Sequence, residues 1–175
     1  EGGYYTQEDC RRVMEAAKKH GVIVIPEIDM PGHSAAFERA MGFSMQTEEG
    51  KKVLKAALDE VIEVFTDAPY IHIGGDECPT EQWAQNELCL KRVEELGLDG
   101  VHQLQSWLVE ELGTYVKEKY NRDIVVWDEL LAHWNDNNKI KPVVMAWNGI
   151  GFSGKAADRG MKSIIVPYQV LYLDF

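Results

Sequence analysis

Two neighbouring carboxylic acids, Asp76 and Glu77, follow a short apolar segment and a pair of glycines within residues 72–77. Adjacent carboxyl groups repel each other's charge, so they tend to lose their protons at different pH values. One can stay ionised while the other keeps a proton. The glycines remove side chains where a ligand must come close to the backbone. The pattern therefore indicates an acid–base site, although a strand followed by an exposed acidic helix start has the same sequence.

The composition indicates one soluble globular domain, because 45% of the 175 residues are hydrophobic and 27% are charged. With 29 acidic and 18 basic side chains the formal net charge is -11, which argues against nucleic acid and membranes as partners. No apolar run reaches the roughly 18 residues of a membrane-spanning helix, and the amino end carries no signal-peptide pattern. Cys10, Cys78 and Cys89 lack metal-site spacing, so we expect structural cysteines and leave a disulfide open.

Helices and strands are predicted to alternate along the chain. Thr6 and Asp9 form a capping-box pattern for a helix that ends at Gly21. The β-branched residues 22–25 predict a strand buried on both faces. Further strands are expected at residues 70–73, 124–127, 143–147 and 162–166. Further helices are expected at 53–65, at about 80–96 with Thr80 as cap, at about 99–116 with Asp99 as cap, and at about 154–159.

This alternation predicts a parallel α/β sheet with right-handed crossovers. Polar and aromatic residues follow every strand: Asp29, His33, Asp76, Glu77, Trp127, Asp128, Glu129, Trp147, Asn148, Tyr168, Tyr172 and Asp174. Such residues at every carboxyl end favour a (β/α)8 TIM-barrel type over an open doubly wound sheet. A full barrel takes about 250 residues, so we expect an incomplete barrel here. Its open edges predict a longer parent chain, self-association with another copy, or low stability alone.

The chain resembles the catalytic barrel of family 20 glycoside hydrolases, the β-N-acetylhexosaminidases. The resemblance extends from residues 3–6 to residues 172–174, and its most specific parts are residues 26–33 and 72–77. By their order, these two motifs resemble the third and fourth barrel strands. The resemblance therefore implies that residues 1–175 form one partial catalytic domain, from about strand three to strand seven, without the first two strands and the eighth.

The family resemblance implies removal of terminal non-reducing N-acetylhexosamine (GlcNAc or GalNAc) from glycans by a retaining, substrate-assisted mechanism. The 2-acetamido oxygen of the sugar attacks the anomeric carbon and forms an oxazolinium ion, so no carboxylate nucleophile is needed. Carried over by motif, Glu77 is the general acid and then the base, and Asp76 orients the acetamido group. Tyr172 would donate a hydrogen bond to the acetamido oxygen and pre-organise the attack.

Four further residues resemble substrate-binding residues of the family. Trp127 and Trp147 match pocket tryptophans that stack on the sugar and its methyl group. Asp174 matches a position that binds sugar hydroxyls, and His33 matches a residue that forms a hydrogen bond toward the acid. No cofactor is expected, and no metal, because ligand spacing is missing at His20, His102 and His133.

The remaining polar residues of these loops carry simpler expectations. We expect Glu27 and Asp29 to brace loops inside the barrel mouth. Asp128 and Glu129 could reach a neighbouring sugar subsite or could stabilise a helix start, and both readings stay open. His72 lies inside a strand, and we expect a packed, hydrogen-bonded core histidine.

The chain also departs from the family pattern. The loop after His33 is short, which leaves the outer substrate subsites undefined, and the sugar-binding arginine and the last pocket tryptophan are not present. We therefore expect little or no activity from the isolated segment. One alternative is a two-carboxylate retaining glycosidase with Glu77 as acid and Glu27 or Glu129 as nucleophile, roughly 5 Å away. Another is an inactive carbohydrate-binding remnant. The family resemblance implies a location outside the cytoplasm, which nothing in the residues themselves demonstrates.

Overall fold

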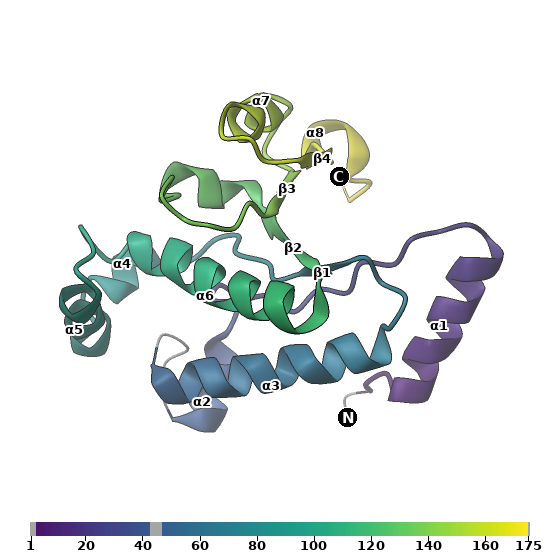
Figure 1. Ribbon diagram of the computed structural model, residues 1–175, viewed down its shortest axis with the longest axis horizontal. Coiled ribbons are helices and arrows are strands. Elements are labelled where there is room, and N and C mark those ends of the chain that lie inside the picture. Colours follow the sequence, from purple (N-terminus) through teal and green to yellow (C-terminus); the bar gives the residue numbers. More distant parts are fainter. Residues whose placement is uncertain (1–2, 43–46, 175) are drawn as a thin grey trace.

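The computed structural model describes residues 3–42 and 47–174. Within these residues, a parallel sheet of four strands has the order β1-β2-β3-β4 (Figure 1). The strands are β1 (Tyr70–His72), β2 (Asp123–Trp127), β3 (Val143–Ala146) and β4 (Ser163–Ile165). All four lie where the sequence predicts a strand, and consecutive strands are neighbours in the sheet. The parallel α/β prediction is therefore confirmed, while closure of a barrel stays a prediction.

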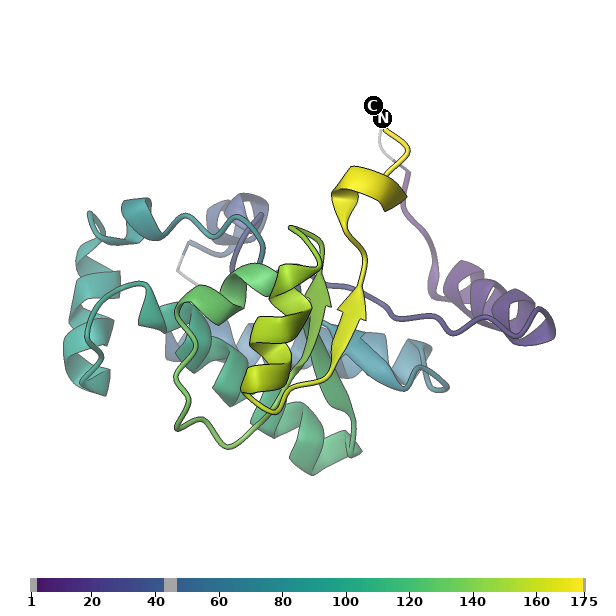
Figure 2. The same ribbon diagram turned by 90° about the horizontal axis from the view of Figure 1, so that it is seen from above.

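Helices connect these strands. They are α1 (Gln7–Lys19), α2 (Ala35–Met41), α3 (Glu48–Val64), α4 (Thr80–Trp83), α5 (Glu87–Leu96), α6 (Gln103–Tyr120), α7 (Gly151–Asp158), α8 (Tyr168–Leu171) and the 3-10 helix η1 (Asp128–Ala132). Helices α3 and α6 lie side by side along the sheet in Figure 1. Figure 2 shows α7 in front of β3 and β4, and both views place α1 and α5 at opposite ends of the molecule.

The main core lies between one face of the sheet and helices α3 and α6. Ile71 and Val126 from the strands pack with Leu58 of α3 and Leu112 of α6, and all four are almost fully buried. Because side chains alternate along a strand, the residues between these apolar positions point to the other face. His72 and Trp127 therefore share the face that looks away from α3 and α6.

The strand predicted at residues 22–25 does not form, and this prediction is wrong. Val22 and Ile23 are 59% and 68% exposed. The chain joins β1 later, at an isolated parallel bridge between Glu27 and His72. In this register, residues 22–24 lie opposite the turn before β1, where Pro69 has no N–H to donate. The β-branched run is therefore extended but finds no strand beside it among the described residues.

Two helix predictions also need correction. The helix expected at 80–96 is divided into α4 and α5, because the Asn86 side chain caps a new helix by accepting hydrogen bonds from the N–H groups of Leu88 and Cys89. Thr80 does not cap α4. The Asp99 side chain binds Gln103 instead of capping the backbone of α6, which begins after His102.

Several other expectations are confirmed or refined. Thr6 and Asp9 form the predicted capping box of α1. The short loop expected after His33 contains helix α2, and α8 was not predicted. The three cysteines are free thiols. No described helix has the length and apolar character needed to cross a membrane.

Candidate active site

The turn after β1 carries the two adjacent acids and is fixed from both sides. The Gly75 N–H donates to Asp29 Oδ1 at 3.0 Å, and the Gly75 carbonyl accepts from Gln105 Nε2 at 2.6 Å. Gly74 has a φ of +69°, and a Cβ added there would collide with the side chain of Asp29. Gly74 therefore makes room for Asp29, and Gly75 makes room for Gln105, whereas the sequence reading supposed that the glycines make room for a ligand. The prediction that Asp29 braces a loop is confirmed.

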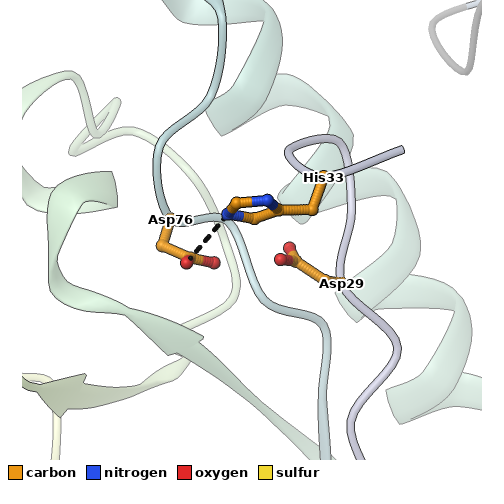
Figure 3. Close-up of side chains that lie close together, drawn as sticks. All are labelled: Asp29, His33 and Asp76. Atoms are coloured by element: carbon orange, nitrogen blue, oxygen red, sulfur yellow. Dashed lines mark ion pairs between the residues drawn. The ribbon is translucent and has the colours of Figure 1, made fainter. Parts of the chain in front are cut away.

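The carboxyl groups of Asp76 and Glu77 meet at the same imidazole nitrogen. His33 Nε2 lies 3.3 Å from Asp76 Oδ2 and 3.3 Å from Glu77 Oε2, and Figure 3 shows the first of these contacts. His33 and Glu77 both have a φ of +48°, a left-handed conformation that non-glycine residues rarely adopt. The side chain of Asp76 is 23% exposed and that of Glu77 is 64% exposed. The structure thus brings these three predicted site residues together.

Asp29 joins this group of acids. Asp29, His33 and Asp76 each have one nitrogen or oxygen atom that could bind a metal ion, and these three atoms lie within 4.8 Å of one another. The carboxyl groups of Asp29 and Asp76 point toward each other in Figure 3. Burial raises the pKa of Asp29 to about 6, and the charge of Asp76 adds to the rise. The Gly75 N–H donates to Asp29, and His33 Nε2 lies 3.3 Å from Asp76 Oδ2, so we interpret the cluster as an acid–base network.

Each of the two predicted pocket tryptophans is held by a glutamate. Trp127 Nε1 donates to Glu27 Oε1 at 3.0 Å, and Trp147 Nε1 donates to Glu129 Oε2 at 2.9 Å. The backbone of Glu27 pairs with that of His72, so the side chains of these two residues lie on the same face of the sheet. Trp127 lies on this face as well, and Glu27 can therefore reach it. Burial raises the pKa values of Glu27 and Glu129. The two glutamates weighed as alternative nucleophiles therefore orient aromatic rings.

Tyr172 lies at the same edge of the sheet. Its ring stacks on Trp147, with ring centroids 6.3 Å apart and an interplanar angle of 18°. Burial raises the pKa of Tyr172, and the charges of Asp76, Asp174, Glu27 and Glu129 raise it further. The Tyr172 hydroxyl therefore lies within electrostatic range of Asp76. Asp174 itself is exposed.

The open question about Asp128 and Glu129 is answered for Asp128. Asp128 is fully buried and accepts hydrogen bonds from the backbone N–H and the side-chain amide of Asn148, at 2.9 and 2.6 Å. It cannot reach a sugar and instead fixes the loop after β3. Both acids begin the 3-10 helix η1.

His72 is a core histidine, as predicted. It is 2% exposed, and its Nδ1 accepts a hydrogen bond from the Gly74 N–H at 2.9 Å. Burial lowers the pKa of His72 to about 4, so the ring is neutral at pH 7. A neutral histidine here supports the turn that carries Asp76.

Glu77 also borders a pocket of about 250 Å³ between α2 and α4. His33, Pro31, Pro79 and Trp83 are among the residues that line it. The residue that sequence reasoning missed entirely is Gln105, which is 6% exposed and holds the Gly75 carbonyl from α6. No motif marks it, because a glutamine on a helix far along the chain carries no local signal of this contact.

A parallel α/β sheet with acids and tryptophans at its carboxyl edge is the arrangement found in barrel enzymes that cleave glycosidic bonds. The sequence model described as "Glycosyl hydrolase family 20, catalytic domain" matches residues 1–50 and 38–175. The chain therefore belongs to glycosyl hydrolase family 20, and the resemblance given on its motifs is confirmed.

Curated relatives agree with this assignment. A beta-hexosaminidase of Porphyromonas gingivalis is 33% identical over 98% of this chain and 24% of its own length. A beta-hexosaminidase of Vibrio furnissii is 30% identical over 99% of this chain and 31% of its own length. The chain thus spans about a quarter to a third of the relatives that it matches.

Solved structures show the same similarity. The family 20 exo-beta-N-acetylglucosaminidase of Vibrio harveyi, crystallised with N-acetylglucosamine, has a TM-score of 0.87 at 26% identity, over 99% of this chain and 30% of that one. The beta-N-acetylhexosaminidase of Bacteroides fragilis has a TM-score of 0.80 at 29% identity, over 93% and 36% of the two chains. The described fold is therefore shared with part of these enzymes.

Proposed function

We propose that this chain supplies the acid–base part of a β-N-acetylhexosaminidase active site, which removes terminal GlcNAc or GalNAc from glycans with retention of configuration. Family membership and the names of the relatives support the substrate class. The observation that carries the proposal is the convergence of Asp76 and Glu77 on His33 Nε2, at 3.3 Å each. Two carboxyl groups beside one imidazole nitrogen are close enough to act on the same sugar, one on the acetamido group and the other on the leaving oxygen.

In this mechanism, Asp76 orients the nucleophile. Its partly exposed carboxylate accepts a hydrogen bond from the acetamido N–H, and the acetamido oxygen then attacks the anomeric carbon. Positive charge develops on the acetamido nitrogen as the oxazolinium ring closes, and the Asp76 carboxylate stabilises it. Tyr172 donates from its hydroxyl to the acetamido oxygen and limits its movement before attack.

Glu77 moves the protons. Its carboxyl group gives a proton to the leaving oxygen as the glycosidic bond breaks, and its carboxylate later takes a proton from the water that opens the oxazolinium ion. The exposed side chain and the adjacent pocket leave room for the leaving group. His33 Nε2 lies 3.3 Å from the same carboxyl group and keeps it beside the reaction centre.

The tryptophans form the walls of the sugar site in this proposal. Trp127 and Trp147 stack against the ring and the acetamido methyl group, and Asp174 binds sugar hydroxyls. The sheet becomes part of a closed (β/α)8 barrel, in which β1 to β4 follow the segment at residues 26–30. Self-association through open sheet edges and a location outside the cytoplasm remain predictions.

Hydrolysis of a chromogenic N-acetylglucosaminide by the full-length protein, beside the matched glucoside, tests the proposal. We expect strong preference for the acetamido sugar, because the glucoside lacks the internal nucleophile. We also expect Asp76→Asn to weaken the binding of a thiazoline analogue of the oxazoline. Equal hydrolysis of both substrates, or a glycosyl-enzyme with the sugar bound to Glu129 or Glu27, would instead support the two-carboxylate mechanism.

A further inference from the structure

The inner oxygen of Asp76 has no hydrogen-bond donor among the described residues. Asp76 Oδ1 is buried and unpartnered, while Oδ2 contacts His33. In Figure 3 the oxygen of Asp76 that is not joined to His33 faces the carboxyl group of Asp29. A buried carboxylate oxygen without a donor is costly. A proton on Asp29 would supply the missing donor.

The position of Asp29 is fixed independently of that proton. Its Oδ1 accepts from the Gly75 N–H at 3.0 Å, and its side chain occupies the space that a Cβ on Gly74 would fill. One oxygen of Asp29 is therefore an acceptor toward the backbone, and the other is free to carry hydrogen. The neighbouring carboxyl groups of Asp29 and Asp76 would repel each other strongly if both were ionised.

We propose that Asp29 is a positioning residue that keeps a proton and donates it in a hydrogen bond to Asp76 Oδ1, so that Asp76 presents its other oxygen to the sugar amide. This inference rests on the proposed function, and it assigns to Asp29 a task beyond bracing the loop. No covalent bond is formed or broken at Asp29. The residue acts only by orienting Asp76 and by keeping the pair at a single negative charge.

The surrounding charges agree with a protonated Asp29. Burial and the charge of Asp76 raise its pKa to about 6, although the Gly75 N–H and the charge of His33 oppose the rise. Cys78 also lies within electrostatic range of Asp29, but the Cys78 thiol is neutral because burial raises the pKa of Cys78 to about 12. Activity is therefore expected to fall as the pH rises through about 6 and the shared proton is lost.

Asp29→Asn and Asp29→Ala in the full-length protein test the inference through the pH dependence of kcat/KM on a chromogenic N-acetylglucosaminide. Asparagine keeps the acceptor for Gly75 and has an amide that donates to Asp76 at every pH. We expect Asp29→Asn to stay within about threefold of the unaltered protein at its optimum and to move the alkaline limb up by about one pH unit or more. Alanine removes both contacts, and we expect roughly a hundredfold loss.

Asp158→Asn is the matched control, because it removes one negative charge from an exposed position at the end of α7. It should leave both the rate and the pH profile unchanged. The inference is overturned if Asp29→Asn loses as much activity as Asp29→Ala, or if its alkaline limb coincides with that of the unaltered protein. A shift of the limb in Asp158→Asn would also overturn it, since the effect would then be one of net charge.

A second measurement separates this inference from the proposed function. Carbon NMR of labelled aspartate carboxyl groups should reveal one group that titrates near pH 6 and is missing in Asp29→Asn. If the unaltered protein fails to hydrolyse the N-acetylglucosaminide, the proposed function fails, but the titration still decides the carboxyl pairing. If no such group titrates, the shared proton does not exist and the inference is wrong.

Discussion

Replacement of Gly74 by alanine should destabilise the protein, because this position has two independent requirements for glycine. Its φ is +69°, and an added methyl group would collide with the Asp29 side chain and Cα. A left-handed conformation costs an L-residue about 1–2 kcal/mol. Overpacking a well-filled site costs roughly 1–3 kcal/mol more. We therefore expect Gly74→Ala to lower the free energy of unfolding by about 2–5 kcal/mol.

Thermal unfolding followed by circular dichroism measures this loss. For a domain of this size each kcal/mol shifts Tm by about 2–4 °C, so the expected decrease is roughly 4–20 °C. Gly154→Ala is the matched control, because Gly154 lies within helix α7 and an added Cβ meets no atom within 4 Å. Alanine there should stabilise the protein by about 0.5–1 kcal/mol.

The two substitutions can refute the reasoning. If Gly74→Ala has the same Tm as the unaltered protein, Asp29 is not packed against the turn as described. If Gly74→Ala is destabilised but Asp29→Ala restores none of the loss in the double variant, the cost does not come from the contact with the Asp29 carboxyl group.

Three further predictions follow from the same contacts. Because burial raises the pKa of Asp29 to about 6 in the folded protein, its contribution to stability is complete below the unfolded value of 3.8 and is lost as the pH rises through about 6. Asp29 is partly exposed, so we expect a loss on the order of 1 kcal/mol in urea unfolding between about pH 4 and pH 7, absent in Asp29→Asn. An equal pH dependence in the variant would contradict this. Trp127→Phe keeps an aromatic face but removes the hydrogen bond to Glu27, so N-acetylglucosamine should bind roughly tenfold more weakly by calorimetry; an unchanged Kd would show that ring orientation does not depend on Glu27. Cys78 should react with thiol reagents more slowly than Cys10 at mildly alkaline pH, because burial raises the pKa of Cys78 to about 12. Equal rates for the two thiols would contradict the raised pKa of Cys78.

The four paired strands were predictable because each is a compact apolar segment between helical patterns. The run at residues 22–25 is equally apolar but is not a strand. A strand needs a neighbouring segment to pair with, and the segment beside this run is interrupted by Pro69. A local pattern cannot report whether a partner strand lies beside it. The division between α4 and α5 was detectable in principle, because Asn86 is a strong N-cap residue.

The site was predictable where residues follow a strand directly. Asp76, Trp127 and Trp147 could be placed at one sheet edge because parallel strands end together. The contacts that hold them could not be predicted. Asp29 reaches Gly75 across two loops, and Gln105 reaches the same peptide from α6. Such contacts join residues that are distant in the sequence, and no periodic pattern of residues predicts them.

The proposed division of tasks between Asp76 and Glu77 is tested most directly by leaving-group dependence in the full-length protein. Glu77→Gln and Asp76→Asn should be compared with the unaltered protein on aryl N-acetylglucosaminides whose phenols range from strongly to weakly acidic. We predict that the loss in Glu77→Gln grows steeply as the phenol becomes less acidic, since the missing proton matters most there. We predict a loss in Asp76→Asn that is nearly the same for every phenol. Equal leaving-group dependence in the two variants would contradict the assignment of the proton to Glu77 and of the amide to Asp76.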